Sequence, residues 1–320
     1  MEHLPQALLG EIVKRITRTT DLNSLSLVSK LLYTIEAEQR SSIRVGCDLF
    51  PATLAITSLC SQFLNLCNVE INYSGWTDNN GMQLDNQGLS VLVTSCPSLT
   101  DLTLSFLTLS FCSYIDDSGL GCLARCRKLT SLKLNSVTAI SSIGLLTVAV
   151  RCKSLSTLHL ICFKKASGVE WLKYLGKEGS LEELVVVDCK GISQYDLLNF
   201  GSGWMKLKKF EFEIKGLVNI VQPCDPSYVP NCQYRYDFSC ENLKDLTLAR
   251  VVTMPEIGLR FLLSKCRVLE KLCLYYVVGI TDNDMITLSH SCNNLRSISL
   301  RLEPIFHYGP EGRHVIALRL

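Results

Sequence analysis

The sequence lacks three features that often reveal a function: an excess of one charge, a long apolar run and a catalytic motif. Its net charge is +2 over 320 residues, and charged residues make up only 19%. No broad attraction to nucleic acid or to an acidic membrane is therefore expected. No apolar stretch approaches the ~18 residues needed to cross a bilayer. The opening segment MEHLPQALLGEIVKRI has charges among its apolar positions, unlike a secretory signal.

Catalytic patterns are also missing. The chain has no P-loop, no G-x-S-x-G and no H-E-x-x-H, and its five histidines are scattered along the sequence. No paired C-x-x-C indicates a zinc-binding RING of its own. We therefore expect no catalysis by this chain, no cofactor and no metal, so that any chemistry belongs to its partners.

What the sequence does contain is a repeat. The pattern L-x-x-L-x-L recurs nine times, and five of the eight intervals between first leucines are 26 residues. Each unit reads as a short strand of alternating polarity followed by a turn and an amphipathic helix, as in KLTSLKLNSVTAISSIGLLTVAVRC. One unit cannot bury its apolar face alone, so the units must stack. The sequence predicts an α/β solenoid over residues 46–320, with parallel strands on the concave side and helices on the convex side.

The cysteines follow the same period. With no secretory signal, sixteen cysteines indicate reduced thiols in the cytoplasm or nucleus. Cysteine is a small buried apolar residue that suits a tight helix end. Metal binding by Cys122 and Cys126 is the alternative, but no histidine lies near them and the repeat already explains Cys126. Six cysteines stand three residues before the first leucine of a unit: Cys96, Cys126, Cys152, Cys240, Cys266 and Cys292.

These units resemble the cysteine-containing leucine-rich repeat, L-x-x-L-x-L-x-x-C-x-x-I-[ST]-D-x-G-L-x-x-L. The stretches LTLSFCSYIDDSGLGCL and KLCLYYVVGITDNDMITL carry the resemblance most closely. LTLSF occurs twice in succession, at 102–106 and at 107–111, and the second copy begins the first of these stretches. Either copy fits the strand position, so we predict a strand with two nearly equivalent registers.

Residues 1–45 lie outside the repeat and form a predicted all-α unit. LPQALLGEIVKRI has apolar residues at helical spacing, and TTDLNSLSLVSKLLY offers capping residues before a second apolar helix. One interpretation is a cap that covers the first repeat. The residue pattern of this segment also closely resembles the F-box, which precedes leucine-rich repeats and docks on the Skp-type adaptor of a cullin-RING ubiquitin ligase. The resemblance implies adaptor contacts for Leu4, Pro5, Leu8, Leu9, Ile12, Leu22, Leu25 and Val28. Leu32 stands where that family often has tryptophan.

Two features are candidates for substrate binding. The loop at 213–239 is long and rich in proline, tyrosine and arginine, residue types that stiffen loops or dominate interfaces. Strand alternation also places a few apolar side chains on the concave face of the sheet, which is otherwise polar, and there they would form an exposed patch. The alternative is that the loop only covers its own repeat. The candidate substrate residues are His159, Ile161, Val185, Val187, Tyr228, Tyr234, Arg235 and Tyr236.

Together these patterns predict a substrate-recognition subunit of an SCF-type ubiquitin ligase that binds an unidentified protein. A ligase-independent leucine-rich scaffold is the alternative. Plant auxin and jasmonate receptors have a similar layout, but no hormone pocket is identifiable here. After NLRSISL the repeat pattern stops, so the array ends either in an irregular cap or in a continuation.

Overall fold

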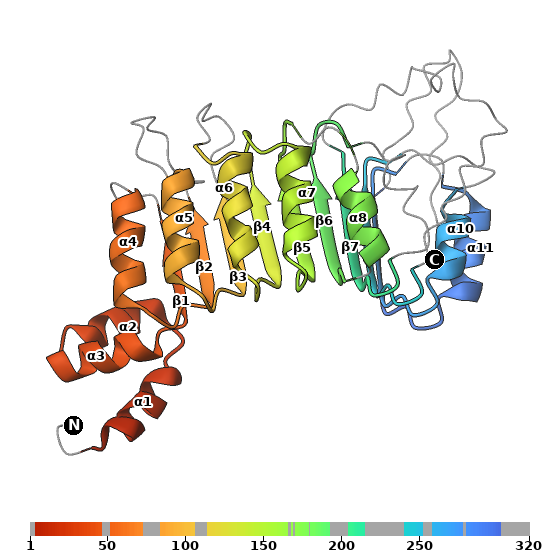
Figure 1. The fold of residues 1–320 in the computed structure, drawn as a ribbon. Coiled ribbons are helices and arrows are strands. Elements are labelled where there is room, and N and C mark those ends of the chain that lie inside the picture. The colour runs from red at the N-terminus through yellow and green to blue at the C-terminus, as the bar shows by residue number, and fades with distance from the viewer. Residues whose placement is uncertain are drawn as a thin grey trace, which may run out of the picture.

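The chain folds as a single parallel sheet with helices on one face and a small helical unit at its N-terminal end (Figure 1). The computed structural model describes residues 4–46, 52–72, 84–105, 114–165, 168, 170–178, 180–192, 204–214, 240–251, 258–277 and 280–301. Within these residues, ten strands follow one another in chain order, and every pair of neighbours is parallel. This is the predicted α/β leucine-rich-repeat solenoid.

The strands are short and nearly equal in length. The strand bounds are β1 Ser42–Val45, β2 Asn68–Asn72, β3 Asp101–Ser105, β4 Ser131–Asn135, β5 Thr157–Ile161, β6 Glu183–Val187, β7 Lys209–Glu213, β8 Asp245–Ala249, β9 Lys271–Tyr275 and β10 Ser297–Arg301. Helices α1 Gln6–Lys14, α2 Thr19–Ser26 and α3 Lys30–Gln39 precede the sheet. Those beside it are α4 Ala52–Gln62, α5 Asn86–Ser95, α6 Asp117–Cys122, α7 Ser142–Arg151, α8 Glu170–Glu178, α10 Gly258–Lys265 and α11 Asp282–Ser291.

Alternation along each strand decides which face is buried. In β4 the side chains of Leu132 and Leu134 are buried under the helices, whereas Lys133 between them points to the other side and is half-buried. The register keeps equivalent leucines opposite one another, as with Leu132 and Leu158. Stacked leucines therefore form one continuous core along the array. We call the sheet face opposite the helices the open face.

The predicted role of the cysteines is confirmed for the six periodic positions. All six are buried and free, and they stand directly after helices such as α5, α7 and α11. Cys152 donates its thiol to the Leu123 carbonyl of the preceding repeat at 3.5 Å. Burial, aided by the nearby Cys152 and Cys96, raises the pKa of Cys126 to about 12, so this thiol stays protonated. These cysteines fill the core.

The sheet begins earlier than the expected boundary at residue 45. Strand β1 lies inside the predicted N-terminal unit and pairs with β2, with Ile43 opposite Val69. The helical unit has its own separate core, formed by Leu9, Val13, Leu32 and Ile35. The division between the two cores therefore falls near residue 41, between α3 and β1.

The structure shows one register for the strand at the duplicated LTLSF segment. The first copy contributes its first four residues, 102–105, to β3, with Leu102 opposite Leu132 and Leu104 opposite Leu134. The second copy lies outside the described residues. The predicted alternative register of β3 stays a prediction.

Candidate functional site

Helix α1 carries two apolar stripes on different sides. Leu9 and Val13 are buried against α3, where they meet Leu32 and Ile35. Leu8 lies next to Leu9 in sequence but about 100° away around the helix, and its side chain is 53% exposed. An amphipathic helix needs only one apolar stripe to pack on its own unit, so the second stripe is left facing outward.

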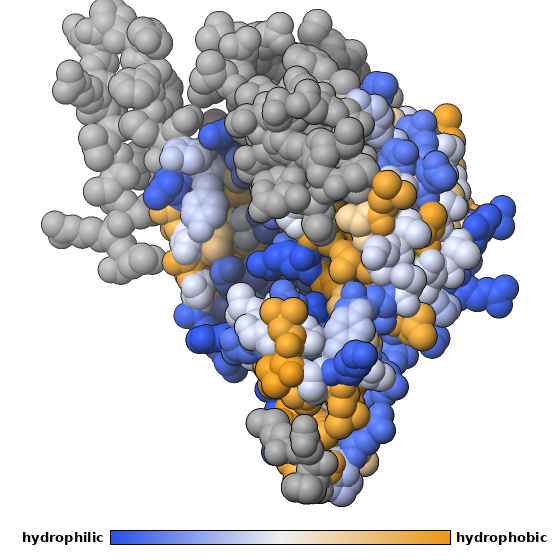
Figure 2. Space-filling view, turned by 90° about the vertical axis from the view of Figure 1, so that its left-hand side faces the viewer, coloured by the Kyte–Doolittle hydropathy of each residue, from blue (hydrophilic) through white to orange (hydrophobic). Residues whose placement is uncertain are grey.

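More apolar side chains are exposed where α2 ends and α3 begins. Leu27 is 87% exposed and Val28 is 70% exposed. Among the described residues, half of the exposed large apolar side chains lie between positions 4 and 33, and Figure 2 shows such side chains gathered in the lower part of this end view. We call this set the N-terminal apolar surface: Leu4, Leu8, Ile12, Leu27, Val28, Leu31 and Tyr33.

The structure divides the predicted adaptor residues into two groups. Leu4, Pro5, Leu8, Ile12 and Val28 are exposed. Leu9 is 3% exposed, so its side chain belongs to the core and the expectation that it faces a partner is corrected. Leu22 and Leu25 are half-buried and pack against the same core. Sequence reasoning missed Leu27 and Leu31, because Leu27 lies in the turn between helices, where no periodicity points to it.

Arg40 forms a buried ion pair within the helical unit and also contacts the first repeat. Arg40, at the end of α3, donates from Nε to the Glu36 carboxylate, and both residues are almost fully buried. The same guanidinium donates from Nη2 to Asn23 Oδ1 at 2.8 Å. Its Cζ atom lies 4.6 Å from the ring centroid of Phe63, the residue after α4 that occupies the cysteine position of the first repeat. Arg40 therefore links α2, α3 and the solenoid.

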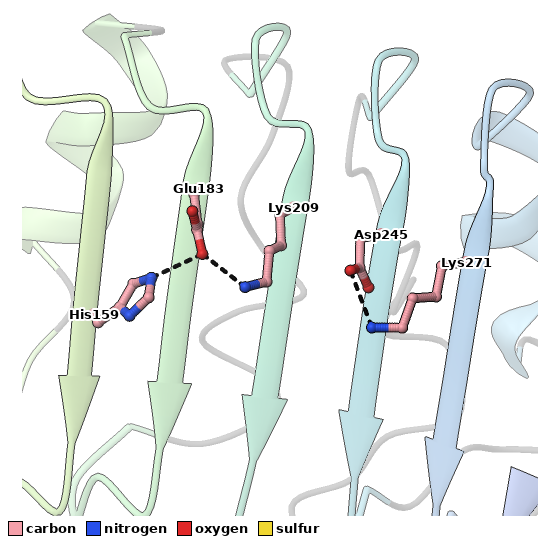
Figure 3. A network of polar contacts seen from close by, with 5 residues as sticks. All are labelled: His159, Glu183, Lys209, Asp245 and Lys271. Carbon is pink, nitrogen blue, oxygen red and sulfur yellow. Dashed lines mark hydrogen bonds and ion pairs between the residues drawn. The ribbon is translucent and has the colours of Figure 1, made fainter. Parts of the chain in front are cut away.

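The open face carries a network of charged side chains across neighbouring strands (Figure 3). Glu183 Oε1 accepts from Lys209 Nζ at 2.7 Å and contacts His159 Nε2 at 2.8 Å. Farther along, Lys271 Nζ lies 3.3 Å from Asp245 Oδ2. Each acid in this network has a cation on an adjacent strand, so the charges of this row largely cancel.

The protonation states of this cluster follow from burial and hydrogen bonding. Burial lowers the pKa of His159, and this effect outweighs the opposing effect of Glu183, so the imidazole is neutral at neutral pH. Burial tends to raise the pKa of Glu183, but hydrogen bonds from Lys209 and His159 lower it overall. The cluster therefore holds a neutral histidine and a carboxylate paired with one lysine.

The predicted apolar patch is smaller than expected. Ile161 and Val187 are opposite each other in β5 and β6 and are half-buried. Val185 is only 4% exposed, and the expectation that it contributes to an exposed patch is wrong. Its short side chain lies in the same row as two longer neighbours, His159 and Glu211. Tyr228, Tyr234, Arg235 and Tyr236 lie outside the described residues.

Between β4 and β7, two charges on the open face have no ion-pair partner among the described residues. Lys133 of β4 and Glu211 of β7 occupy the same row as His159 and Val185. Both side chains are half-buried. They have opposite signs and stand on either side of the strands that carry Ile161 and Val187. The alternation of the sequence predicted that both side chains lie on the open face. The sequence did not show that they lack ion-pair partners, because this depends on how the other charged side chains pair.

Comparisons with known proteins agree with the fold. No protein-family model matches the chain. The chain resembles one from the yeast Rad7–Elc1 complex at 19% identity and a TM-score of 0.51, over 92% of this chain and 67% of that one. It also resembles one from the TLR13–ssRNA13 complex at 16% identity and a TM-score of 0.50, over 85% of this chain and 34% of that one. It spans only about a third of the latter's length.

A third structure, an internalin from Listeria monocytogenes, is 16% identical with a TM-score of 0.39, over 84% of this chain and 63% of that one. At these identities the first two likenesses establish the solenoid fold, and the internalin adds no argument. Among the helices the structure describes, none is long and apolar enough to cross a membrane.

Proposed function

We propose that this chain is the substrate-recognition subunit of an SCF-type ubiquitin ligase, in the cytoplasm or nucleus. The N-terminal apolar surface docks on a Skp-type adaptor and through it on a cullin-RING ligase. The open face and the loop at 213–239 hold a protein substrate. The chain binds no cofactor and catalyses nothing itself, because its part is to bring the substrate to the ligase.

The observation that carries this proposal is the concentration of exposed apolar side chains on α1 to α3. Full burial of a leucine-sized side chain contributes about 1.5–3 kcal/mol. Leu8 and Ile12 are 53% and 51% exposed, so covering the rest of each contributes on the order of 1 kcal/mol. Several such side chains on one small unit give a partner enough apolar area to offset the cost of association.

The likeness to the Rad7–Elc1 complex is consistent with this arrangement. That structure holds a solenoid of this fold together with a second protein, Elc1. Its low identity transfers no contact residue to this chain, so the adaptor surface is argued from the exposed side chains alone.

A ligase-independent scaffold is the second candidate, and one observation favours it. Arg40 packs the helical unit onto Phe63 of the first repeat, as an N-terminal cap would require. A cap protects the end of an apolar core from water. A cap alone, however, gives no reason for a second apolar stripe on α1 that stays exposed.

The experiment that separates the two is co-elution with purified Skp-type adaptors. The test variant is Leu8→Asp with Ile12→Asp. The matched control is Leu54→Asp with Ile143→Asp, because these side chains are 66% and 72% exposed but lie on α4 and α7. We expect the parent and the control to co-elute with adaptor and the test variant to elute alone, with circular dichroism unchanged in all three.

Two results would reject the ligase proposal. A folded parent that co-elutes with none of the adaptors would leave the helices as a cap. A test variant that binds as well as the parent would show that the exposed stripe of α1 is not the docking surface.

A further inference from the structure

The middle row of the open face changes sign along the sheet. From β4 to β7 it contains Lys133, His159, Val185 and Glu211. His159 is held neutral by burial, and Val185 carries no charge. The row therefore runs from an unpaired cation to an unpaired anion across two uncharged positions.

Several other charges on this face have a partner on an adjacent strand, and Asp101 and Arg301, which have no ion-pair partner among the described residues, lie on β3 and β10, outside the four central strands. Arg44 Nη2 lies 2.8 Å from Glu70 Oε2, between β1 and β2. Glu183 is held by Lys209 and His159, and Asp245 pairs with Lys271. Because an unpaired, half-buried charge keeps more of its field than a paired one, Lys133 and Glu211 dominate the electrostatics of the central strands.

We infer that the open face between β4 and β7 binds an extended peptide segment that crosses the strands, with an acidic side chain over Lys133, apolar side chains over Ile161 and Val187, and a basic side chain over Glu211. The inference deepens the proposed function, and it rests on that function in treating this segment as part of the substrate protein.

Strand spacing sets the separation of the two charges in such a peptide. Adjacent strands lie about 4.8 Å apart, so β4 and β7 are separated by about 14 Å. An extended chain advances about 3.3 Å per residue, so the acidic and basic side chains stand about four residues apart. The residues between them meet Ile161 and Val187, which are half-buried and opposite each other in β5 and β6.

The charge layout also disfavours a polyanion. A nucleic acid that crossed the face beside Lys133 would next meet Glu211 and Glu213 on β7. Arg250 Nη1 approaches Glu213 Oε1 only at 3.9 Å, so this acid is weakly compensated. Like charges opposed across an interface weaken binding.

The test begins with a displayed library of random short peptides, selected on the full chain. We expect selected peptides to carry an acidic and a basic residue about four positions apart with apolar residues between. One selected peptide is then synthesised, and its affinity is measured for the parent and for Lys133→Glu and Glu211→Lys. Each variant should weaken binding about tenfold, as expected for the loss of a close charge pair.

Charge reversal on the peptide supplies the decisive comparison. A peptide whose acidic residue is replaced by lysine should bind Lys133→Glu about as well as the original binds the parent. A peptide whose basic residue is replaced by glutamate should do the same for Glu211→Lys. The matched control is the exchange Arg44→Glu with Glu70→Arg, on the same face at β1 and β2, which should leave the original affinity unchanged. If a reversal variant fails to fold, Lys133→Gln and Glu211→Gln replace it.

The inference is overturned if the library enriches no peptides with opposite charges at this spacing, or if the reversed variants bind the selected peptide like the parent. Neither measurement uses an adaptor. A chain that selects these peptides yet binds no adaptor refutes the ligase proposal alone, and the opposite result refutes the peptide site alone.

Discussion

Two glycines of α6 should respond to alanine in opposite directions. Gly119 and Gly121 are two residues apart in the same helix. A Cβ atom on Gly119 would lie 2.1 Å from Asn86 Oδ1 and 2.9 Å from Asn86 Cγ, whereas one on Gly121 would meet nothing within 4 Å. The glycine at 119 therefore leaves space for a side chain of the preceding repeat, and the glycine at 121 does not.

The Asn86 side chain has a structural task that a clash would disturb. Its Nδ2 donates to Asp116 Oδ1 at 2.8 Å and to Ser118 Oγ at 3.0 Å, and its Oδ1 accepts from the Asp116 amide at 3.1 Å. Asp116 caps α6, so Asn86 connects the start of one helix to the start of the next. A methyl group at position 119 forces Asn86 away from these partners.

The expected magnitude follows from these contacts. Each hydrogen bond contributes about 0.5–1.5 kcal/mol, and the lower part of that range applies because the site is partly exposed. Alanine in a helix gains up to about 1 kcal/mol over glycine. Losing the three hydrogen bonds outweighs the alanine gain, so Gly119→Ala should lower the free energy of unfolding by about 0.5–2 kcal/mol, and Gly121→Ala should raise it by up to about 1 kcal/mol.

Urea unfolding followed by circular dichroism measures both variants against the parent. A third variant tests the cause: once Asn86→Ala has removed the obstructing amide, adding Gly119→Ala should be neutral or stabilising. Equal shifts for the two glycine variants, or a destabilising Gly119→Ala in the Asn86→Ala background, would refute the role assigned to Asn86.

Two further changes give sharp expectations. Arg40→Ala leaves the Glu36 carboxylate buried without its cation and should lower the free energy of unfolding, measured by urea titration, by about 3–5 kcal/mol. The double variant Glu36→Leu with Arg40→Met should recover most of that loss. An Arg40→Ala variant as stable as the parent would contradict the role assigned to Arg40. Because burial lowers the folded-state pKa of His159, its contribution to stability is complete above its unfolded-state pKa of about 6.5 and is lost as the pH falls through the lower folded value. His159→Gln should therefore flatten the fall in unfolding free energy on mild acidification, and a variant with the same pH dependence as the parent would contradict this.

The repeat period was sufficient to predict the fold, because it assigns each leucine of the pattern to a fixed buried position in its repeat. Leu132 and Leu158 share a register, and the cysteine before each unit is buried, as the spacing requires. Strand β1 was missed because it is short and no L-x-x-L-x-L pattern precedes it. Its only sequence signal is the alternation of Ile43 and Val45.

Other features depend on contacts between repeats that no single unit reveals. Ser136, Cys162, Asp188, Arg250 and Tyr276 directly follow strands in the left-handed conformation, where glycine would be expected. The backbone N–H of each residue donates a hydrogen bond to the carbonyl at the end of the next strand, as Cys162 N does to Val187 O at 2.8 Å.

The candidate site was predictable only in part, for the same reason. Alternation assigned Val185 to the outer face, but its burial depends on the size of its neighbours in the row. The exposure of Leu27 depends on where α2 ends. Helical periodicity alone did not distinguish Leu9 from Leu8.

The joint at Arg40 has a consequence for which substrate lysines could be modified. Because the buried Arg40 also stacks on Phe63, this contact resists rotation, so helices α1 to α3 and the open face keep a constant angle. Under the proposed function, a captured protein is then presented to the ligase in one orientation. Acceptor lysines would be chosen by where they stand on that protein rather than by the sequence around them, and loosening the joint would broaden the choice.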